Sequence, residues 1–230
     1  MDKPLQPAPL RIDIVSDVVC PWCIIGYKQL QLALARMGDA FEVRVYWQPF
    51  ELNPGMPGEG QDLGEHLARK YGTSAAQSQA ARARLTALGE SLGFRFDYFE
   101  GMRIYNTFQA HQLLHWAGEP AQAPGTQTSL KLALFDAFFS RRENVGNTAT
   151  LAIIAARAGL PEQEAREILA DGRYAEAVRR DQARWLDRDV HAVPMFFFNE
   201  VFPVPGAQEA DTFVRILSRL RDHDRAGAVS

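Results

Sequence analysis

The sequence predicts a mixed α/β fold in which a large all-helical insertion follows the second strand. Three observations lead to this fold class. The start of the chain shows the pattern of a strand, a helix and a second strand, and its end shows two strands and a helix. Between these two parts, more than half of the 230 residues show the spacing of apolar residues that is typical of helices.

The first strand is expected at residues 10–19. Leu10, Ile12 and Ile14 alternate there with polar residues, and a period of two is typical of a half-buried strand. The helix behind it is expected to begin near Pro21, because proline is tolerated in a first helical turn.

The rest of this helix and the second strand follow directly. Apolar residues recur every three or four positions over 23–37, which places them on one helix face, and Gly38 ends the helix. Alternation returns over 41–50, the second strand. A crossover of this length implies that the two strands are parallel.

The middle of the chain is expected to be helical, with boundaries uncertain by a few residues. Boundaries between helices are marked by Pro161, at the start of a helix, and by Gly159 and Gly172, each directly after the end of one. The expected helices cover residues 62–71, 74–92, 106–117, 128–141, 148–158, 161–170 and 173–187.

The end of the chain returns to strands. An apolar run at 193–198 and a second strand at 201–204 are joined by a tight turn at Asn199-Glu200. A closing helix after Gly206 carries four apolar residues on one face, Phe213, Ile216, Leu217 and Leu220.

These patterns divide the chain into four parts. Residues 1–52 and 188–222 are expected to form one α/β domain, and residues 53–187 a helical insertion domain. Residues 223–230 are expected to be a frayed tail.

The composition excludes several classes of function. A net charge of −3, with no dense basic cluster, gives no electrostatic basis for binding nucleic acid. No apolar stretch approaches the roughly 20 residues that span a bilayer. The first residues lack the apolar core of a secretory signal, so a cytoplasmic location is expected. The apolar pattern fits a monomer or a homodimer.

Both cysteines of the chain lie in one motif, Cys20-Pro21-Trp22-Cys23. Two cysteines cannot form a disulfide scaffold. In a chain without a secretory signal, this spacing indicates either redox chemistry or half of a metal site.

The position of the motif assigns a role to each thiol. Cys20 stands at the predicted start of a helix, where unpaired N–H groups favour an anion, so its pKa is expected below the free value of about 8.5. Cys23 falls on the buried helix face, and Cys20 is expected at an exposed tip. Cys20 would then attack a substrate disulfide and Cys23 would resolve the mixed disulfide, with Pro21 and Trp22 tuning the thiolate.

Two other interpretations of the cysteines were weighed. They could be core residues that happen to be close, although the first residue of a helix is usually accessible to solvent. They could also bind a metal with His111 and His115, which lie four residues apart, as a Cys₂His₂ site requires. Closed zinc sites rarely combine elements this far apart in sequence, so no metal is expected.

A second feature is Val193-Pro194, at the start of the apolar run. A trans proline inside a central strand would remove a ladder donor. A cis proline at the start of the strand avoids this loss and leaves the Val193 backbone free to pair with an extended peptide. An ordinary loop proline is the alternative.

Together these motifs resemble the DsbA-like branch of the thioredoxin superfamily, and FrnE-type members in particular. The resemblance covers residues 10–220. The matching segments are Asp17 to Cys23 with Ile25-Gly26, Trp47 to Pro54, Asn106-Thr107 with Ala110-His111, Asn144 to Gly146, Val193-Pro194 and Gly206 to Gln208.

This resemblance implies a thioredoxin-like fold with the helical block inserted after the second strand, and catalysis by the dithiol. It implies that Val193 and cis-Pro194 line the substrate groove, and that His111 and Asn106 face it from the helical domain. No tightly bound cofactor is implied beyond the redox-active disulfide itself, with glutathione as a candidate co-substrate. The expected substrates are proteins or small molecules that contain a thiol or a disulfide.

Related chains that act as glutathione-dependent 2-hydroxychromene-2-carboxylate isomerases carry serine at the first motif position. This chain has Cys20 there, which favours dithiol exchange and leaves the isomerase as the alternative. A third hypothesis is a non-catalytic binding protein in which the cysteines are incidental.

Overall fold

The computed structural model describes residues 7–227 and contains a four-stranded mixed sheet in the order β2-β1-β5-β6. The first two strands, β1 (Ala8–Ser16) and β2 (Phe41–Pro49), are parallel. The strands β5 (Met195–Phe198) and β6 (Phe202–Pro205) continue the sheet in antiparallel order. The predicted mixed α/β class and the parallel first pair are therefore confirmed.

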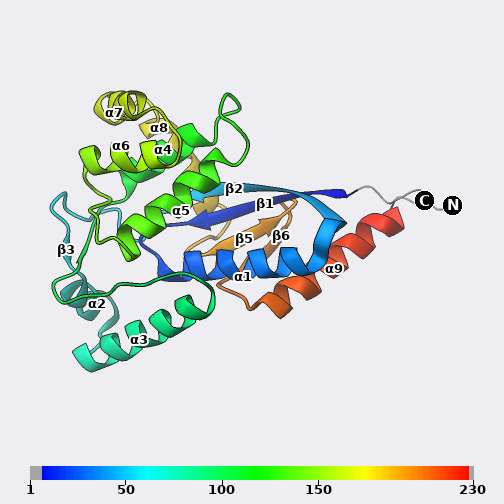
Figure 1. Ribbon diagram of the computed structural model, residues 1–230, viewed down its shortest axis with the longest axis horizontal. Helices are drawn as coiled ribbons and strands as arrows, with labels where there is room; N and C mark the ends of the chain where they lie inside the picture. Colours follow the sequence, from blue (N-terminus) through cyan, green and yellow to red (C-terminus); the bar gives the residue numbers. More distant parts are fainter. Residues whose placement is uncertain (1–6, 228–230) are drawn as a thin grey trace.

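Two helices cover one face of the sheet and pack side by side (Figure 1). These are α1 (Pro21–Met37) and α9 (Ala210–Gly227). The contact is close at Gly26, where an added Cβ would lie 3.0 Å from the ring of Phe196 and 3.2 Å from Ala207 Cα. Glycine at this position lets the dithiol helix approach β5 and the segment before α9.

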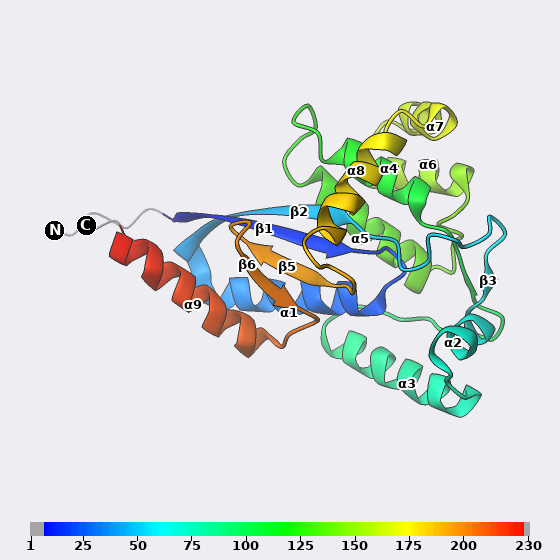
Figure 2. The ribbon, with the colours of Figure 1, turned by 180° about the vertical axis from the view of Figure 1, so that it is seen from behind.

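Most helices from the middle of the chain lie along the β2 edge of the sheet, and the one that carries Trp185 packs over the other face, against Val15 and Phe197 (Figure 2). Three of them pack against β2, namely α4 (Phe108–Ala117), α5 (Thr126–Phe139) and α8 (Ala175–Leu186). Two lie further out, α6 (Thr148–Arg157) and α7 (Glu162–Asp171). Gln127 fixes α5 to the sheet, because its side-chain amide bonds both the N–H and the C=O of Trp47 at 2.9 and 3.0 Å.

The remaining helices, α2 (Leu63–Tyr71) and α3 (Ala75–Ser91), form a hairpin near the carboxyl end of β1 and the start of α1 (Figures 1 and 2). Ser74 and Gln77 start α3 with a reciprocal capping box. Two short strands, β3 (Gln61–Asp62) and β4 (Arg103–Ile104), form an antiparallel pair that the sequence did not predict. This pair connects the start of the hairpin to the segment that precedes α4.

Two expected boundaries change, and one expected turn is confirmed. The first strand ends at Ser16 and not at residue 19, because the chain turns there toward α1. The turn at Asn199-Glu200 is confirmed by positive φ angles of 50° and 62°. The prediction that the frayed tail begins at 223 is wrong, because α9 continues to Gly227. Residues 228–230 of that tail lie outside the described residues.

The sheet and the middle helices share one continuous apolar core. Among the residues that the structure describes, none of the helices combines the length and the hydrophobicity needed to cross a bilayer.

Candidate active site

The candidate site begins where β1 ends and α1 starts. The N–H of Cys20 bonds the carbonyl oxygen of Asp17 at 3.3 Å, and Cys20 then takes the extended N-cap position of α1. Pro21 occupies the first helical turn, where its missing N–H costs nothing. The sequence thus folds locally so that one cysteine caps the helix and the other lies one turn inside it.

Both cysteines are free thiols. The prediction that Cys20 lies at an exposed tip is wrong, because its exposed fraction is only 4%. Cys20 lies in the wall of a cavity of about 660 Å³ that α2 and α3 close on the far side, whereas Cys23 is fully enclosed and does not reach the cavity. Trp22, half exposed, lies at the same wall.

The loop before β5 completes this wall. The Val193–Pro194 peptide bond is cis, as predicted. The carbonyl oxygen of Val193 lies 3.7 Å from the Sγ of Cys20. Gly206, which has a positive φ, donates its N–H to the carbonyl oxygen of Pro194 at 2.9 Å and so ties this loop to β6. Val193 lines the cavity, and Pro194 is buried behind it.

A buried lysine lies beneath the dithiol. Lys131, on α5, is completely enclosed, and its Nζ donates to the carbonyl oxygen of Ser16 at 3.4 Å. The ammonium also lies 5.3 Å from the Trp47 ring centre and 5.1 Å from that of Phe135. Burial lowers the pKa of Lys131 to about 8, although the nearby negative charges of Cys23 and Asp17 oppose this shift.

The two thiols hold their protons unequally. A hydrogen bond with Cys23 is the main cause that raises the pKa of Cys20 well above its ordinary value, and burial adds to it. Burial also raises the pKa of Cys23, but the hydrogen bond from Cys20, the Lys131 ammonium and the Ser16 hydroxyl outweigh it, so the pKa of Cys23 is lowered. The prediction of a lowered pKa for Cys20 is therefore wrong for the reduced pair. The expectation was based on the helix N-terminus alone. The groups around the two thiols favour the first ionisation at Cys23.

A second buried pair lies next to this cluster. The Oδ2 of Asp17 accepts from the N–H of Leu52 at 2.8 Å, and its Oδ1 lies 3.5 Å from the Nε2 of His111. The same His111 nitrogen bonds the carbonyl oxygen of Phe50 at 3.0 Å. Burial raises the pKa of Asp17, but His111, the Leu52 N–H and Lys131 together lower it below its ordinary value.

His111 and Asn106 were both expected to face the substrate groove, but neither lines the cavity that contains Cys20. His111 is buried behind the chain segment at Phe50. Asn106 accepts from the N–H of Phe108 at the start of α4 and donates to the carbonyl oxygen of Pro54 at 3.4 Å. Both side chains therefore hold the backbone that borders the cavity instead of contacting its interior.

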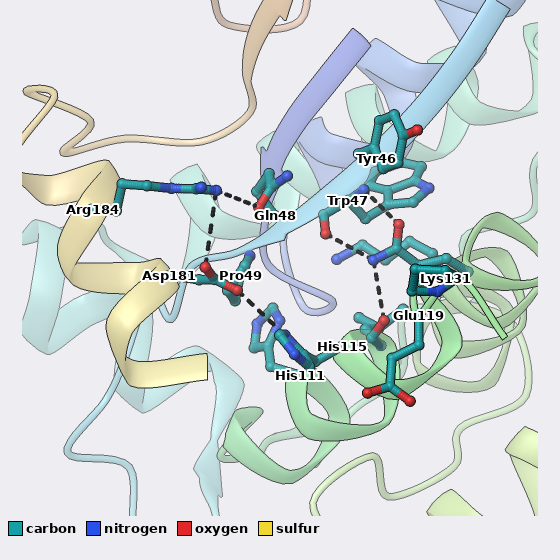
Figure 3. Close-up of a pocket in the computed structure, with 14 residues that line it drawn as sticks. Tyr46, Trp47, Gln48, Pro49, His111, His115, Glu119, Lys131, Asp181 and Arg184 are labelled. Carbon is teal, nitrogen blue, oxygen red and sulfur yellow. Dashed lines mark hydrogen bonds and ion pairs between the residues drawn. The ribbon is translucent and has the colours of Figure 1, made fainter. Parts of the chain in front are cut away.

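A second cavity, of about 390 Å³, reaches the buried cluster from the helices α4 and α8 (Figure 3). His111 and Lys131 both line it. At its wall, His115 lies 3.3 Å from Asp181, which is also 3.9 Å from Arg184 (Figure 3). His115 thus pairs with a carboxylate on α8 and does not form a site with the cysteines. Within residues 7–227 as described, no group of three or more His, Cys, Asp or Glu side chains is placed to hold a metal ion.

Sequence reasoning missed Lys131. Its signal was present, because Lys131 is the single charge in the apolar run from Leu130 to Leu134. A helix that is apolar on all sides is buried, so a lone charge within it must be buried as well. No local pattern in the sequence indicates that this charge lies beneath the dithiol.

A dithiol at the start of the first helix, set against a cis-proline loop on a four-stranded mixed sheet, defines a protein of the thioredoxin-like class. The model of the DSBA-like thioredoxin domain family matches residues 11–218, so the chain belongs to this family.

Individual relatives agree with this assignment. The crystal structure of a probable DsbA oxidoreductase from Streptomyces coelicolor has a TM-score of 0.84 and 32% identity, covering 91% of this chain and 89% of that one. The uncharacterized protein YwbO of Bacillus subtilis (strain 168) is 25% identical over 91% of this chain and 96% of its own length. The cytosolic disulfide reductase DsbM of Pseudomonas aeruginosa, in its structure with glutathione, has a TM-score of 0.63 at 17% identity, covering 92% of this chain and 99% of its own, and so shares the fold.

Proposed function

We propose that the protein is a thiol–disulfide oxidoreductase in which Cys20 attacks the substrate and Cys23 resolves the intermediate. The observation that carries this proposal is the unequal placement of the two thiols. Cys20 lines a large cavity and Cys23 does not, yet the two lie one helical turn apart, and the Cys23 N–H donates to the Cys20 carbonyl oxygen at 3.2 Å. Only Cys20 can meet a substrate sulfur, and only Cys23 is held ready to displace it.

The proton distribution fits these roles. The hydrogen bond between the thiols and the Lys131 ammonium lower the pKa of Cys23, and the same hydrogen bond raises the pKa of Cys20. As Cys20 attacks a disulfide, its proton passes to the Cys23 sulfur, the new bond joins Cys20 to the substrate, and one thiolate leaves. Cys23 then loses this proton, attacks Cys20 and releases the second thiolate. Two electrons have moved from the protein to the substrate.

We place this activity in the cytoplasm, in the reducing direction. Cytoplasmic reductants keep thiols reduced, so net reduction is easier to sustain there than net oxidation. Glutathione is the proposed co-substrate that regenerates the dithiol. A cytosolic reductase that shares the fold has been solved with glutathione, which supports this choice.

The test compares the wild type with Cys20→Ser and Cys23→Ser in a turnover assay of disulfide reduction. Cys20→Ser should abolish activity. Cys23→Ser should stop after one attack and leave a mixed disulfide that mass spectrometry detects. A Cys20→Ser protein that still reduced disulfides would overturn the proposal.

The same variants test the alternative, a glutathione-dependent isomerase. Such an enzyme does not need a resolving thiol, so its activity would survive Cys23→Ser. Cys20 in place of serine favours the oxidoreductase.

A further inference from the structure

The cavity next to Cys20 has the size and lining of a small-molecule site. Its volume of about 660 Å³ falls within the range of about 300–1,000 Å³ that is typical of such sites. Cys20 is only 4% exposed, so a substrate sulfur has to enter the cavity to reach it. The apolar residues that form most of the wall away from Cys20 are Leu63, Leu67, Leu85, Tyr98, Ile104, Phe138 and Phe139.

Three buried polar atoms in this wall have no hydrogen-bond partner among the described residues. They are the Oγ of Ser78, the Oγ1 of Thr73 and the Oε1 of Glu51. Ser78 is only 6% exposed, in the first turns of α3. Buried hydroxyls are almost always hydrogen-bonded, so these atoms point to a polar group that occupies the cavity.

The same wall carries two cations without carboxylate partners. Lys70, at the end of α2, bonds the carbonyl oxygen of Leu52 and the side chain of Asn53, both at 2.7 Å. Arg82, on α3, bonds only the carbonyl oxygen of Ser78 through its Nε at 3.3 Å. Neither makes an ion pair with any residue in the described part of the chain. The hairpin wall is therefore complementary to an anion, whereas the one carboxylate of the lining, Glu51, lies outside the hairpin and accepts from the Gln182 amide at 3.1 Å.

We propose that this cavity binds a low-molecular-weight disulfide with an aromatic or similarly apolar body and a carboxylate. The apolar body would lie against the leucine and phenylalanine wall. The carboxylate would lie toward Arg82 and Lys70, with the Ser78 hydroxyl as a further donor. This inference rests on the proposed function, since it names the substrate of the same dithiol.

The reaction on such a substrate balances as follows. Cys20 attacks one substrate sulfur, the substrate S–S bond breaks and the first small thiolate leaves. Cys23 then attacks Cys20, the mixed disulfide breaks and the second small thiolate leaves. The protein ends with a Cys20–Cys23 disulfide, and the substrate has gained two electrons.

The test uses the fully reduced protein and three disulfide probes. Dithiobis(nitrobenzoate) has an aromatic body and carboxylates, bis(nitrophenyl) disulfide has the body alone, and glutathione disulfide has carboxylates without an apolar body. We expect dithiobis(nitrobenzoate) to react with saturation. Arg82→Gln should raise its half-saturation concentration by about tenfold, as expected for a lost charge-assisted bond, with the maximal rate and the rate on the neutral probe unchanged.

Arg84→Gln is the matched control. Arg84 lies on the same helix, is exposed and does not line the cavity, so this variant removes the same charge and should react like the wild type. Lys70→Gln provides a second test if Arg82→Gln proves unstable. Alkylation by iodoacetamide, a neutral reagent, checks that the thiols are equally reactive in every variant.

Two results would overturn the inference while the proposed function stands. One is an equal response of Arg82→Gln and Arg84→Gln to the carboxylate probe. The other is a protein that reduces insulin rapidly but reacts with all three small probes no faster than its unfolded form, which would indicate a protein substrate. A wild-type protein that reduces neither insulin nor any probe would instead contradict the proposed function.

Discussion

The Nζ of Lys131 donates to the carbonyl oxygen of Ser16 across 3.4 Å, although 115 residues separate the two in the sequence. This contact places an ammonium group beneath the strand end that leads into the dithiol. Several consequences of this buried charge can be measured.

Lys131→Met should raise the pKa at which the dithiol first ionises, because the Cys23 thiolate loses its nearest cation. Ultraviolet absorbance of the thiolate against pH measures this directly. Lys28→Met, a change on α1 away from Ser16, is the control, and equal titration of both variants would contradict the prediction.

The stability of the oxidised protein should depend on Lys131 at high pH. The pKa of Lys131 is about 8 in the folded reduced protein, against an ordinary value of 10.5, and the disulfide removes the thiol charges that raise it, so the window in the oxidised protein begins at or below this value. Between these values the unfolded chain binds more protons than the folded one, so the free energy of unfolding rises with pH. Chemical denaturation across this window should show the rise in the wild type and a smaller one in Lys131→Met.

Asp17 should produce a dependence of the same sign at low pH, because there too the unfolded chain binds more protons than the folded one. Its folded-state pKa lies below the ordinary 3.8, so its contribution to stability is present above that value and is lost as the pH falls toward the folded pKa. The difference in stability between the wild type and Asp17→Asn should therefore shrink on acidification.

His111 is expected to be a structural residue. His111→Ala leaves the Phe50 carbonyl and the Asp17 carboxylate without their partner and should cost about 1–3 kcal/mol of folding free energy. His115→Ala, which removes a partly exposed ion pair, should cost less than about 1 kcal/mol. His111 is not among the groups that shift the pKa of either thiol, so titration of His111→Gln should match the wild type. A shifted thiolate pKa would instead support the hypothesis that His111 tunes Cys20.

Gly26→Ala should destabilise the fold by about 1–3 kcal/mol, because its Cβ would press on Phe196 and on the Ala207 backbone. Gly58→Ala is the control, since an added Cβ there meets nothing within 4 Å. Thermal melting of both variants measures the difference. Equal melting temperatures would show that α1 can shift away from β5.

The motif at residues 20–23 allowed much of the site to be predicted. A strand pattern ends before Cys20 and a helical pattern runs from Cys23, so the sequence places the dithiol at a helix start. Val193-Pro194 was identified because proline lacks the N–H that a central strand uses in its ladder, so its position at the start of an apolar strand is informative. Both inferences use local spacing, which a sequence displays directly.

The surroundings of the dithiol were harder to predict because they come from distant segments. Cys20 is enclosed by α2 and α3, which begin more than forty residues later, and no local pattern indicates that this hairpin packs beside α1. The lowered pKa of Cys23 has partly the same origin, since the Lys131 ammonium, which comes from a distant helix, favours its anion. Local spacing determines the elements, and long-range packing determines the electrostatics.

Lys131 lies on α5, in the helical insertion, whereas both cysteines lie at the start of α1, beside the sheet. Oxidation of the cysteines therefore changes an electrostatic contact between the insertion and the sheet. In the reduced protein the ammonium attracts a sulfur anion across the boundary between sheet and insertion. Formation of the disulfide removes that anion, and the ammonium keeps only Asp17 as its buried counter-ion. We therefore expect the insertion to adhere to the sheet more firmly while Cys23 is an anion than after the disulfide has formed.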